Sequence, residues 1–161
     1  MAPEPGERPD SDVTIDDPLS LDQQVCFALS VASRLVVGAY TPVLKPLGLT
    51  HPQYLVMLAL WEKEPRSLSE LANALRLEPP TLSPLLKRLE AAGFITRQRS
   101  VDDERNLAVR LTTSGRELRA QAIAVPPQVV AALGAEERDL TDLLARLTGL
   151  IQQISPSVSG R

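Results

Sequence analysis

The chain has 161 residues, and with 43% of them hydrophobic it can form one domain with a substantial core. No apolar run approaches the 18 residues of a membrane span, no secretory signal precedes the core, and a single cysteine excludes an intramolecular disulfide. We therefore expect a cytoplasmic protein with no membrane partner, no metal and no cofactor.

The net charge of −3 is unevenly distributed. Residues 1–22 hold seven acidic residues and one arginine, whereas residues 23–119 hold thirteen basic and nine acidic residues. Residues 1–18 are rich in Pro, Glu and Asp, so we expect a disordered acidic tail there, and a short flexible tail at 156–161. The basic middle of the chain is the part suited to bind an anionic partner.

Two helices are expected after the acidic tail. The pattern Ser20-x-x-Gln23 predicts the cap of a long apolar helix, which Pro42 bends toward its end. The pattern Thr50-x-x-Gln53 predicts the cap of the next helix.

A pair of shorter amphipathic helices follows. The first opens with the capping box Ser67-x-x-Glu70, and Pro79 and Pro80 suit the first turn of the second. Gly93 suits the left-handed residue that closes it. The apolar residues recur at helical spacing: Leu68, Leu71, Ala72 and Leu75, then Leu82, Leu85, Leu86 and Leu89. This order predicts a helix-turn-helix.

The outer face of the second helix carries polar and basic residues. They are Thr81, Ser83, Pro84, Lys87 and Arg88. Hydroxyls near the helix start can meet base edges or phosphates, and the two cations can hold the phosphate backbone. We assign all five residues to DNA contact.

Residues 94–111 alternate as two strands around the polar turn 100–106. Arg97 on the first strand is also assigned to DNA. Arg105 near the tip is long enough to enter a minor groove, and Asp103 can hold its guanidinium. A solvated helix pair would share the helical pattern alone, but the adjoining basic hairpin favours DNA binding.

The last two helices suggest an assembly. Pro126 and Pro127 must kink or break the helix that Thr112 or Thr113 caps. The final helix, from about residue 135, is apolar at Leu140, Leu143, Leu144, Leu147, Leu150, Ile151 and Ile154. This stripe either covers the core of its own chain or forms the interface of a two-fold dimer. We favour the homodimer because helix-turn-helix proteins commonly bind the two half-sites of a pseudo-palindromic operator.

These elements predict a mainly α fold with a small β-hairpin. Residues 51–112 are expected to form a winged helix-turn-helix DNA-binding region. Residues 19–50 and 113–155 are expected to form a helical dimerisation region. Cys26 lies among apolar neighbours, where a free cysteine is usually an inert core residue.

Several segments together resemble the OhrR branch of the MarR regulators, over roughly residues 19–155. The resemblance rests on Leu21 to Leu29 around Cys26, on Tyr40, Pro42, Leu49 to Tyr54 and Trp61-Glu62, and on Thr81 to Glu90, Gly93, Ile95 to Arg97 and Asp102 to Arg105. It implies a dimeric repressor of an organic-hydroperoxide resistance gene, which leaves its operator when one cysteine is oxidised.

The resemblance places the reactive cysteine at Cys26. The tyrosines that bond to it correspond to Tyr40, His51 and Ser30, so only Tyr40 keeps the family residue. Cys26 and Tyr40 would lie about 21 Å apart on one straight helix. We therefore expect Tyr40 of one subunit to approach Cys26 of the other, with neutral His51 donating a hydrogen bond to the thiolate.

The expected chemistry is oxidation of Cys26 to a sulfenic acid, in a regulator and not an enzyme. The sulfenic acid then reacts with a low-molecular-weight thiol or a neighbouring backbone nitrogen, or it is over-oxidised irreversibly. Three other interpretations remain open. One is a MarR-type regulator released by a small aromatic ligand, with Cys26 structural only. The others are a thiol peroxidase, which the lack of a second cysteine disfavours, and a winged helix that binds only protein.

Overall fold

The computed structural model describes residues 17–99 and 107–158. Most of the expected acidic tail, residues 1–16, lies outside this part of the chain, as do Asp103 and Arg105. The chain divides into two compact units, residues 1–35 and residues 36–161, and the boundary falls within the first long helix.

The first long helix, α1, spans Val25–Leu44 after the short 3-10 helix η1, Leu21–Gln23. The prediction that Ser20 caps this helix is wrong. The Ser20 hydroxyl bonds to the Asp22 carboxylate instead, and Ser20 makes no side-chain cap. The Asp22 carboxylate therefore engages the Ser20 hydroxyl that a side-chain cap of the helix would require.

One helical stretch of the described residues, Val25–Leu47, is long and apolar enough to cross a membrane by length and composition. The expectation that no run approaches that length is therefore wrong. A core helix of a globular protein meets the same two criteria, so length and composition alone do not define a membrane span.

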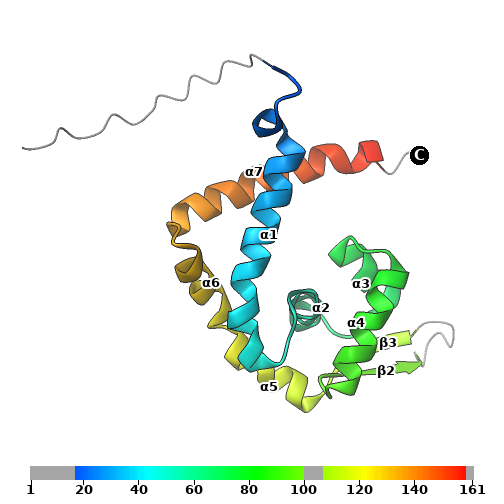
Figure 1. The fold of residues 1–161 in the computed structure, drawn as a ribbon. Helices are drawn as coiled ribbons and strands as arrows, with labels where there is room; N and C mark the ends of the chain where they lie inside the picture. The colour runs from blue at the N-terminus through cyan, green and yellow to red at the C-terminus, as the bar shows by residue number, and fades with distance from the viewer. Residues whose placement is uncertain (1–16, 100–106, 159–161) are drawn as a thin grey trace, which may run out of the picture. The chain divides into compact units, whose positions relative to one another are not determined.

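The remaining elements belong to the second unit (Figure 1). In chain order they are η2 Lys45–Leu47, α2 His51–Glu62, β1 Arg66–Ser67, α3 Leu68–Leu75, α4 Pro79–Ala91, β2 Ile95–Arg99, β3 Leu107–Leu111, α5 Thr113–Ala122, α6 Val125–Leu133 and α7 Glu137–Val158.

Local sequence signals set several of these boundaries as predicted. Thr50 caps α2 and Ser67 caps α3, each as a full capping box with the glutamine or glutamate three residues later. Gly93 has a φ of 79°, the left-handed conformation expected after α4. Proline at the start of α6 marks the predicted break after α5.

The sheet has three antiparallel strands in the order β1-β3-β2. The predicted hairpin is present as β2 and β3, in register from Ile95 opposite Leu111 to Arg99 opposite Leu107. The short β1 adds Arg66 opposite Val109. Two residues are too few to show an alternating pattern, so the sequence did not predict this strand.

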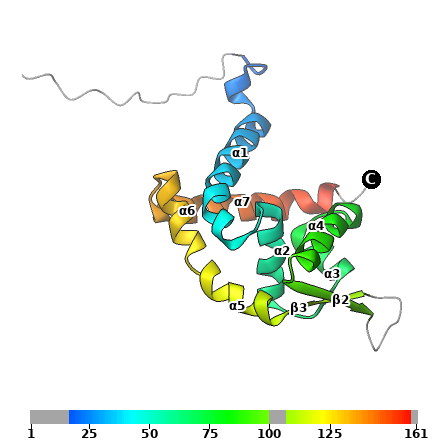
Figure 2. The ribbon, with the colours of Figure 1, turned by 60° about the horizontal axis from the view of Figure 1, so that its bottom comes forward.

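The core of the second unit lies where α2, α3 and α4 pack together beside the sheet (Figure 2). The side chains of Leu71, Leu82 and Leu89 are fully buried, and Ile95 and Val109 bring the strands into the same cluster. The arrangement is a mostly helical winged helix, as predicted.

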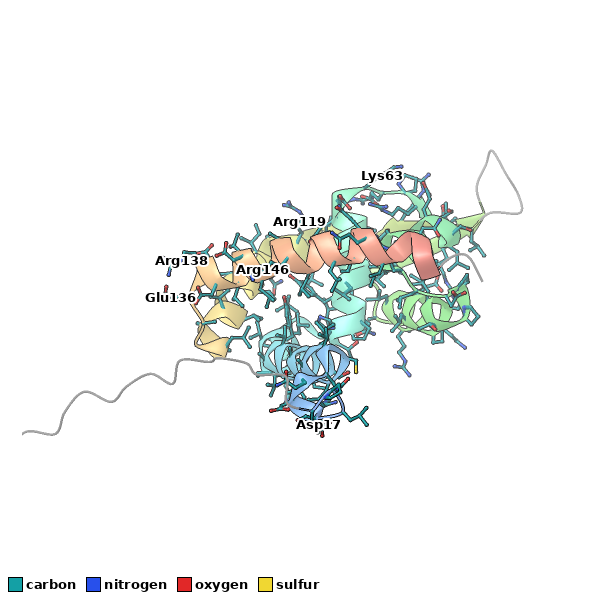
Figure 3. All side chains as sticks on the ribbon, turned by 90° about the horizontal axis from the view of Figure 1, so that it is seen from above. Asp17, Lys63, Arg119, Glu136, Arg138 and Arg146 are labelled. Atoms are coloured by element: carbon teal, nitrogen blue, oxygen red, sulfur yellow. The ribbon has the colours of Figure 1, made fainter. Side chains whose placement is uncertain are left out.

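Helix α7 continues to Val158, so the predicted flexible tail from residue 156 begins too early. Leu143, Leu144 and Leu150 on this helix are exposed in the single chain. Figure 3 shows Glu136 and Arg138 together near its N-terminal end, with Arg146 further along it.

Candidate functional site

Helix α4 presents the predicted DNA-contact residues to solvent. Its apolar stripe is buried, which turns the opposite face outward. Thr81, Ser83, Pro84, Lys87 and Arg88 are all exposed. The structure therefore gathers on one helix face the five residues that sequence analysis assigned there.

Two details adjust the chemistry of that face. The Ser83 hydroxyl donates a hydrogen bond to the Pro79 carbonyl at 3.1 Å, so it already has a partner within the helix. The first turn of α4 is made by two prolines and carries no side-chain cap.

Arg97 has a partner that sequence analysis missed. Its Nη2 and Nε lie 2.6 Å and 2.8 Å from Glu90 Oε2, and its backbone N–H donates to Glu90 Oε1 at 3.1 Å. The hydrogen bond from Arg97 keeps the pKa of the Glu90 carboxyl below its usual range. This pair joins the last turn of α4 to the first strand of the hairpin.

The base of the hairpin has a second anchor at Glu64. Its carboxylate accepts hydrogen bonds from the Leu111 backbone N–H at 2.8 Å and from Arg116 Nε at 2.7 Å. Burial alone would raise the pKa of Glu64, but the hydrogen bonds from Arg116 and Leu111 outweigh it and lower the pKa. Sequence analysis had no signal for this contact, since its partners lie 47 and 52 residues away.

Cys26 lies on α1 within the first unit, and its thiol is free and exposed. The apolar neighbours Val25, Phe27 and Leu29 are exposed in the single chain as well. This exposure disagrees with an inert cysteine sealed inside the core of its own chain. A thiol needs access of this kind to react with a solute.

Tyr40 and His51 lie together within the second unit. Their ring centroids are 4.9 Å apart and the planes meet at 61°, an edge-on contact. Burial lowers the pKa of His51, which favours the neutral imidazole near pH 7. Sequence analysis named both residues, and the structure brings them into contact across the α1–α2 connection.

The three-stranded sheet, the helix pair and the exposed polar face of α4 define a winged-helix DNA-binding protein. Residues 49–107 match the MarR family model. The chain is 37% identical to the organic hydroperoxide resistance transcriptional regulator of Bacillus subtilis, over 86% of this chain and 94% of the relative. The chain belongs to the MarR family of transcriptional regulators.

Two further relatives agree with this assignment. The regulator TtmR of Methylorubrum extorquens is 44% identical, over 82% of this chain and 69% of that protein. A solved structure of reduced AbfR bound to DNA, a protein of Staphylococcus epidermidis, is 35% identical with a TM-score of 0.74, over 86% of this chain and 94% of that one.

Proposed function

We propose that this protein is a repressor that senses organic hydroperoxides by oxidation of Cys26 and then releases its operator. The observation that carries the proposal is the exposed free thiol at the position that its resemblance to the hydroperoxide regulators marks. AbfR has been solved in reduced, overoxidised and disulfide forms, which supports a redox input in this group.

The chemical step is a two-electron oxidation of the thiolate. The sulfur attacks the peroxide oxygen, the O–O bond breaks, and a proton from solvent converts the departing alkoxide into an alcohol. Cys26 becomes a sulfenic acid. A low-molecular-weight thiol then forms a mixed disulfide and releases water, because the sequence offers no second cysteine.

Two subunits are needed to complete this site. Cys26 and Tyr40 are fourteen residues apart on α1 and do not meet within a chain. In a homodimer with antiparallel α1 helices, the Tyr40–His51 pair of one subunit faces Cys26 of the other. Neutral His51 then donates a hydrogen bond to the thiolate, in the role that a tyrosine hydroxyl has in the OhrR pattern.

The DNA partner is a pseudo-palindromic operator that binds one α4 in each half-site. Lys87 and Arg88 hold phosphates, Thr81 and Ser83 lie at the start of the helix, and Arg105 reads the adjacent minor groove with Asp103 beside it. A polar adduct on Cys26 within the apolar dimer interface shifts the subunits relative to each other. DNA affinity falls about tenfold for each 1.4 kcal/mol by which the shifted arrangement is favoured.

A gel shift on the DNA upstream of the protein's own gene tests the proposal. We expect cumene hydroperoxide to release the wild type, while Cys26→Ser stays bound under the same peroxide. Release of both proteins to the same extent would exclude Cys26 as the sensor. Mass spectrometry of the released wild type should show the sulfenic acid or its mixed disulfide.

The role of His51 has its own test. Replacing His51 with Phe keeps a ring beside Tyr40 and removes the hydrogen-bond donor, so we expect oxidation of Cys26 to slow by about tenfold. His51→Gln keeps a donor, and its oxidation rate should lie between those of the wild type and His51→Phe. Stopped-flow measurement gives the three rates, and equal rates for all three proteins would show that the imidazole has no part.

A second candidate function is supported by one observation. A cavity of about 290 Å³ in the second unit is lined by Tyr54, Leu58, Trp61 and Arg119, among others. Its walls are mainly aromatic and apolar, with Glu62 and Arg119 as the charged residues, and they suit a small aromatic ligand. Release of Cys26→Ser from DNA by such a ligand, without any peroxide, would favour this function.

A further inference from the structure

Four ring side chains form a continuous row in the second unit. His51 contacts Tyr40 at 4.9 Å between centroids, Tyr40 contacts Tyr54 at 5.8 Å, and Tyr54 contacts Trp61 at 6.4 Å. We call these four residues the aromatic row. It starts at the pair proposed to face the reactive sulfur and follows α2 toward its C-terminal end.

The far end of the row is tied to α5. Trp61 Nε1 donates a hydrogen bond to the Gly115 carbonyl at 2.8 Å, across 54 residues of sequence. Gly115 lies against the segment that follows α4, because a Cβ added there would stand 2.0 Å from the Phe94 carbonyl oxygen. No Cβ fits in that space, so the first turn of α5 packs directly against the backbone of Phe94.

Hydrogen bonds connect the start of α5 to the residues that directly follow α4. The Gly115 N–H donates to Thr112 Oγ1 at 3.0 Å, and the Thr112 hydroxyl donates to the Gly93 carbonyl at 2.6 Å. The Thr112 N–H donates to the Phe94 carbonyl at 3.0 Å. Gly93 and Phe94 connect the end of α4 to β2, so they help to set the position of both DNA-contacting elements.

We propose that Trp61 is a positioning residue that couples the state of the sensor pair to the position of α4 and the hairpin. The inference rests on the proposed function, since it assumes that oxidation of Cys26 displaces Tyr40 or His51. A displaced Tyr40 pushes on Tyr54, whose side chain is buried, and Tyr54 in turn tilts the indole. The tilt pulls on Gly115, and α5 carries the motion to Phe94.

Packed rings and directional hydrogen bonds transmit displacement better than loose contacts do, because neither can yield without losing the contact. The indole N–H is the one directional link between α2 and α5 in this route. Loss of that N–H should therefore weaken the coupling and leave the ring packing in place.

The test compares operator binding of the wild type and Trp61→Phe before and after cumene hydroperoxide. Phe keeps a ring against Tyr54 and removes the donor to Gly115. We expect the reduced variant to bind DNA within about threefold of the wild type, and the loss of affinity on oxidation to fall by about tenfold. Tyr54→Phe is the matched control, because it keeps the row and the Trp61 bond, and it should behave as the wild type does.

The outcomes separate the two proposals. If peroxide does not release the wild type, the proposed function fails, and this inference fails with it. If peroxide releases the wild type and Trp61→Phe by the same factor, only the role of Trp61 is wrong. Oxidation of Cys26 must be equal in both proteins, which mass spectrometry checks.

A second measurement needs no substitution within the aromatic row. Trp61 is the only tryptophan of the sequence, so its emission reports on this position alone. We expect peroxide to change the emission intensity or wavelength of the DNA-free wild type and to leave Cys26→Ser unchanged. An unchanged spectrum of wild-type protein that peroxide has released from DNA would overturn the inference.

Discussion

At the scale of single residues, Glu64 holds three segments together. Its carboxylate joins the α2–β1 connection to the end of β3 through Leu111 and to α5 through Arg116. The Glu64 side chain is 24% exposed and that of Arg116 is 55% exposed, so solvent screens the ion pair. The hydrogen bond from the Leu111 backbone N–H therefore matters as much for stability as the ion pair does.

The lowered pKa of Glu64 has a defined consequence for stability. The unfolded chain binds a proton at Glu64 more readily than the folded chain does, so the contribution is present above the unfolded pKa and is lost as pH falls through the folded pKa. We expect Glu64→Gln to lower the free energy of unfolding by about 1 kcal/mol at pH 7, and the difference to shrink below about pH 4. Urea titrations at several pH values measure it.

The pair of Glu136 and Arg138 offers a matched control. Their closest atoms are 3.4 Å apart, and the side chains are 74% and 78% exposed. Glu136→Gln should change the free energy of unfolding by no more than about 0.5 kcal/mol at any pH. A Glu64→Gln effect as small as this, or one that grows at acid pH, would contradict the assigned role.

The residues that sequence reasoning found and missed differ in one physical respect. Capping at Thr50 and Ser67 depends on atoms three residues apart, so the pattern is visible in the sequence. The partners of Glu64 and Trp61 are brought close only by the fold. Ser20 shows the limit of local patterns, because a neighbouring Asp22 competes for its hydroxyl.

At the scale of elements, the Arg97–Glu90 pair fixes the hairpin against α4. If Arg97 served only as a phosphate contact, Glu90→Gln would remove a nearby negative charge and tighten DNA binding. We expect the opposite, a weakening of about fivefold, because the guanidinium loses the carboxylate that holds it beside α4. Fluorescence anisotropy on a labelled operator distinguishes the two signs.

Lys87 is exposed on α4 and is the comparison for a pure phosphate contact. We expect Lys87→Ala to reduce the slope of log affinity against log salt by about one unit, with a similar loss on unrelated DNA. Binding measured from low to physiological salt gives the slope. A slope equal to that of the wild type would reject the phosphate contact.

The helices and the hairpin were predictable because each has a period or a cap of its own. The third strand was not, since β1 is defined only by its pairing with β3. Arg97 was placed correctly on its strand, but its partner Glu90 belongs to another element, and an alternating pattern carries no information about such a pair.

At the scale of the whole molecule, the apolar residues of α7 that the single chain leaves exposed require an explanation. Leu143 and Leu150 lie seven residues apart on one helix face and are exposed by 46% and 37%. A dimer that covers this face accounts for them, and for the apolar exposure around Cys26.

We expect Leu143→Glu with Leu150→Glu to reduce the mass in solution from about twice to once the 17.5 kDa of the chain. Operator affinity should fall by at least about 100-fold, because one half-site is lost. Light scattering after size exclusion measures the mass. Ala145→Glu with Gln152→Glu adds the same charge to exposed positions on the opposite face of α7 and should leave the dimer intact.

The continuity of α1 from Val25 to Leu44 has a genetic consequence. If each sensor site, here called a trigger, combines the Cys26 thiol of one subunit with the Tyr40 phenol of the other, then a copy of the chain lacking Cys26 and a copy lacking Tyr40 can complement each other. Mixed pairs of the two defective copies would retain one intact trigger, whereas neither defective copy paired with itself would retain any. Co-expression of two inactive alleles would then restore the peroxide response in part.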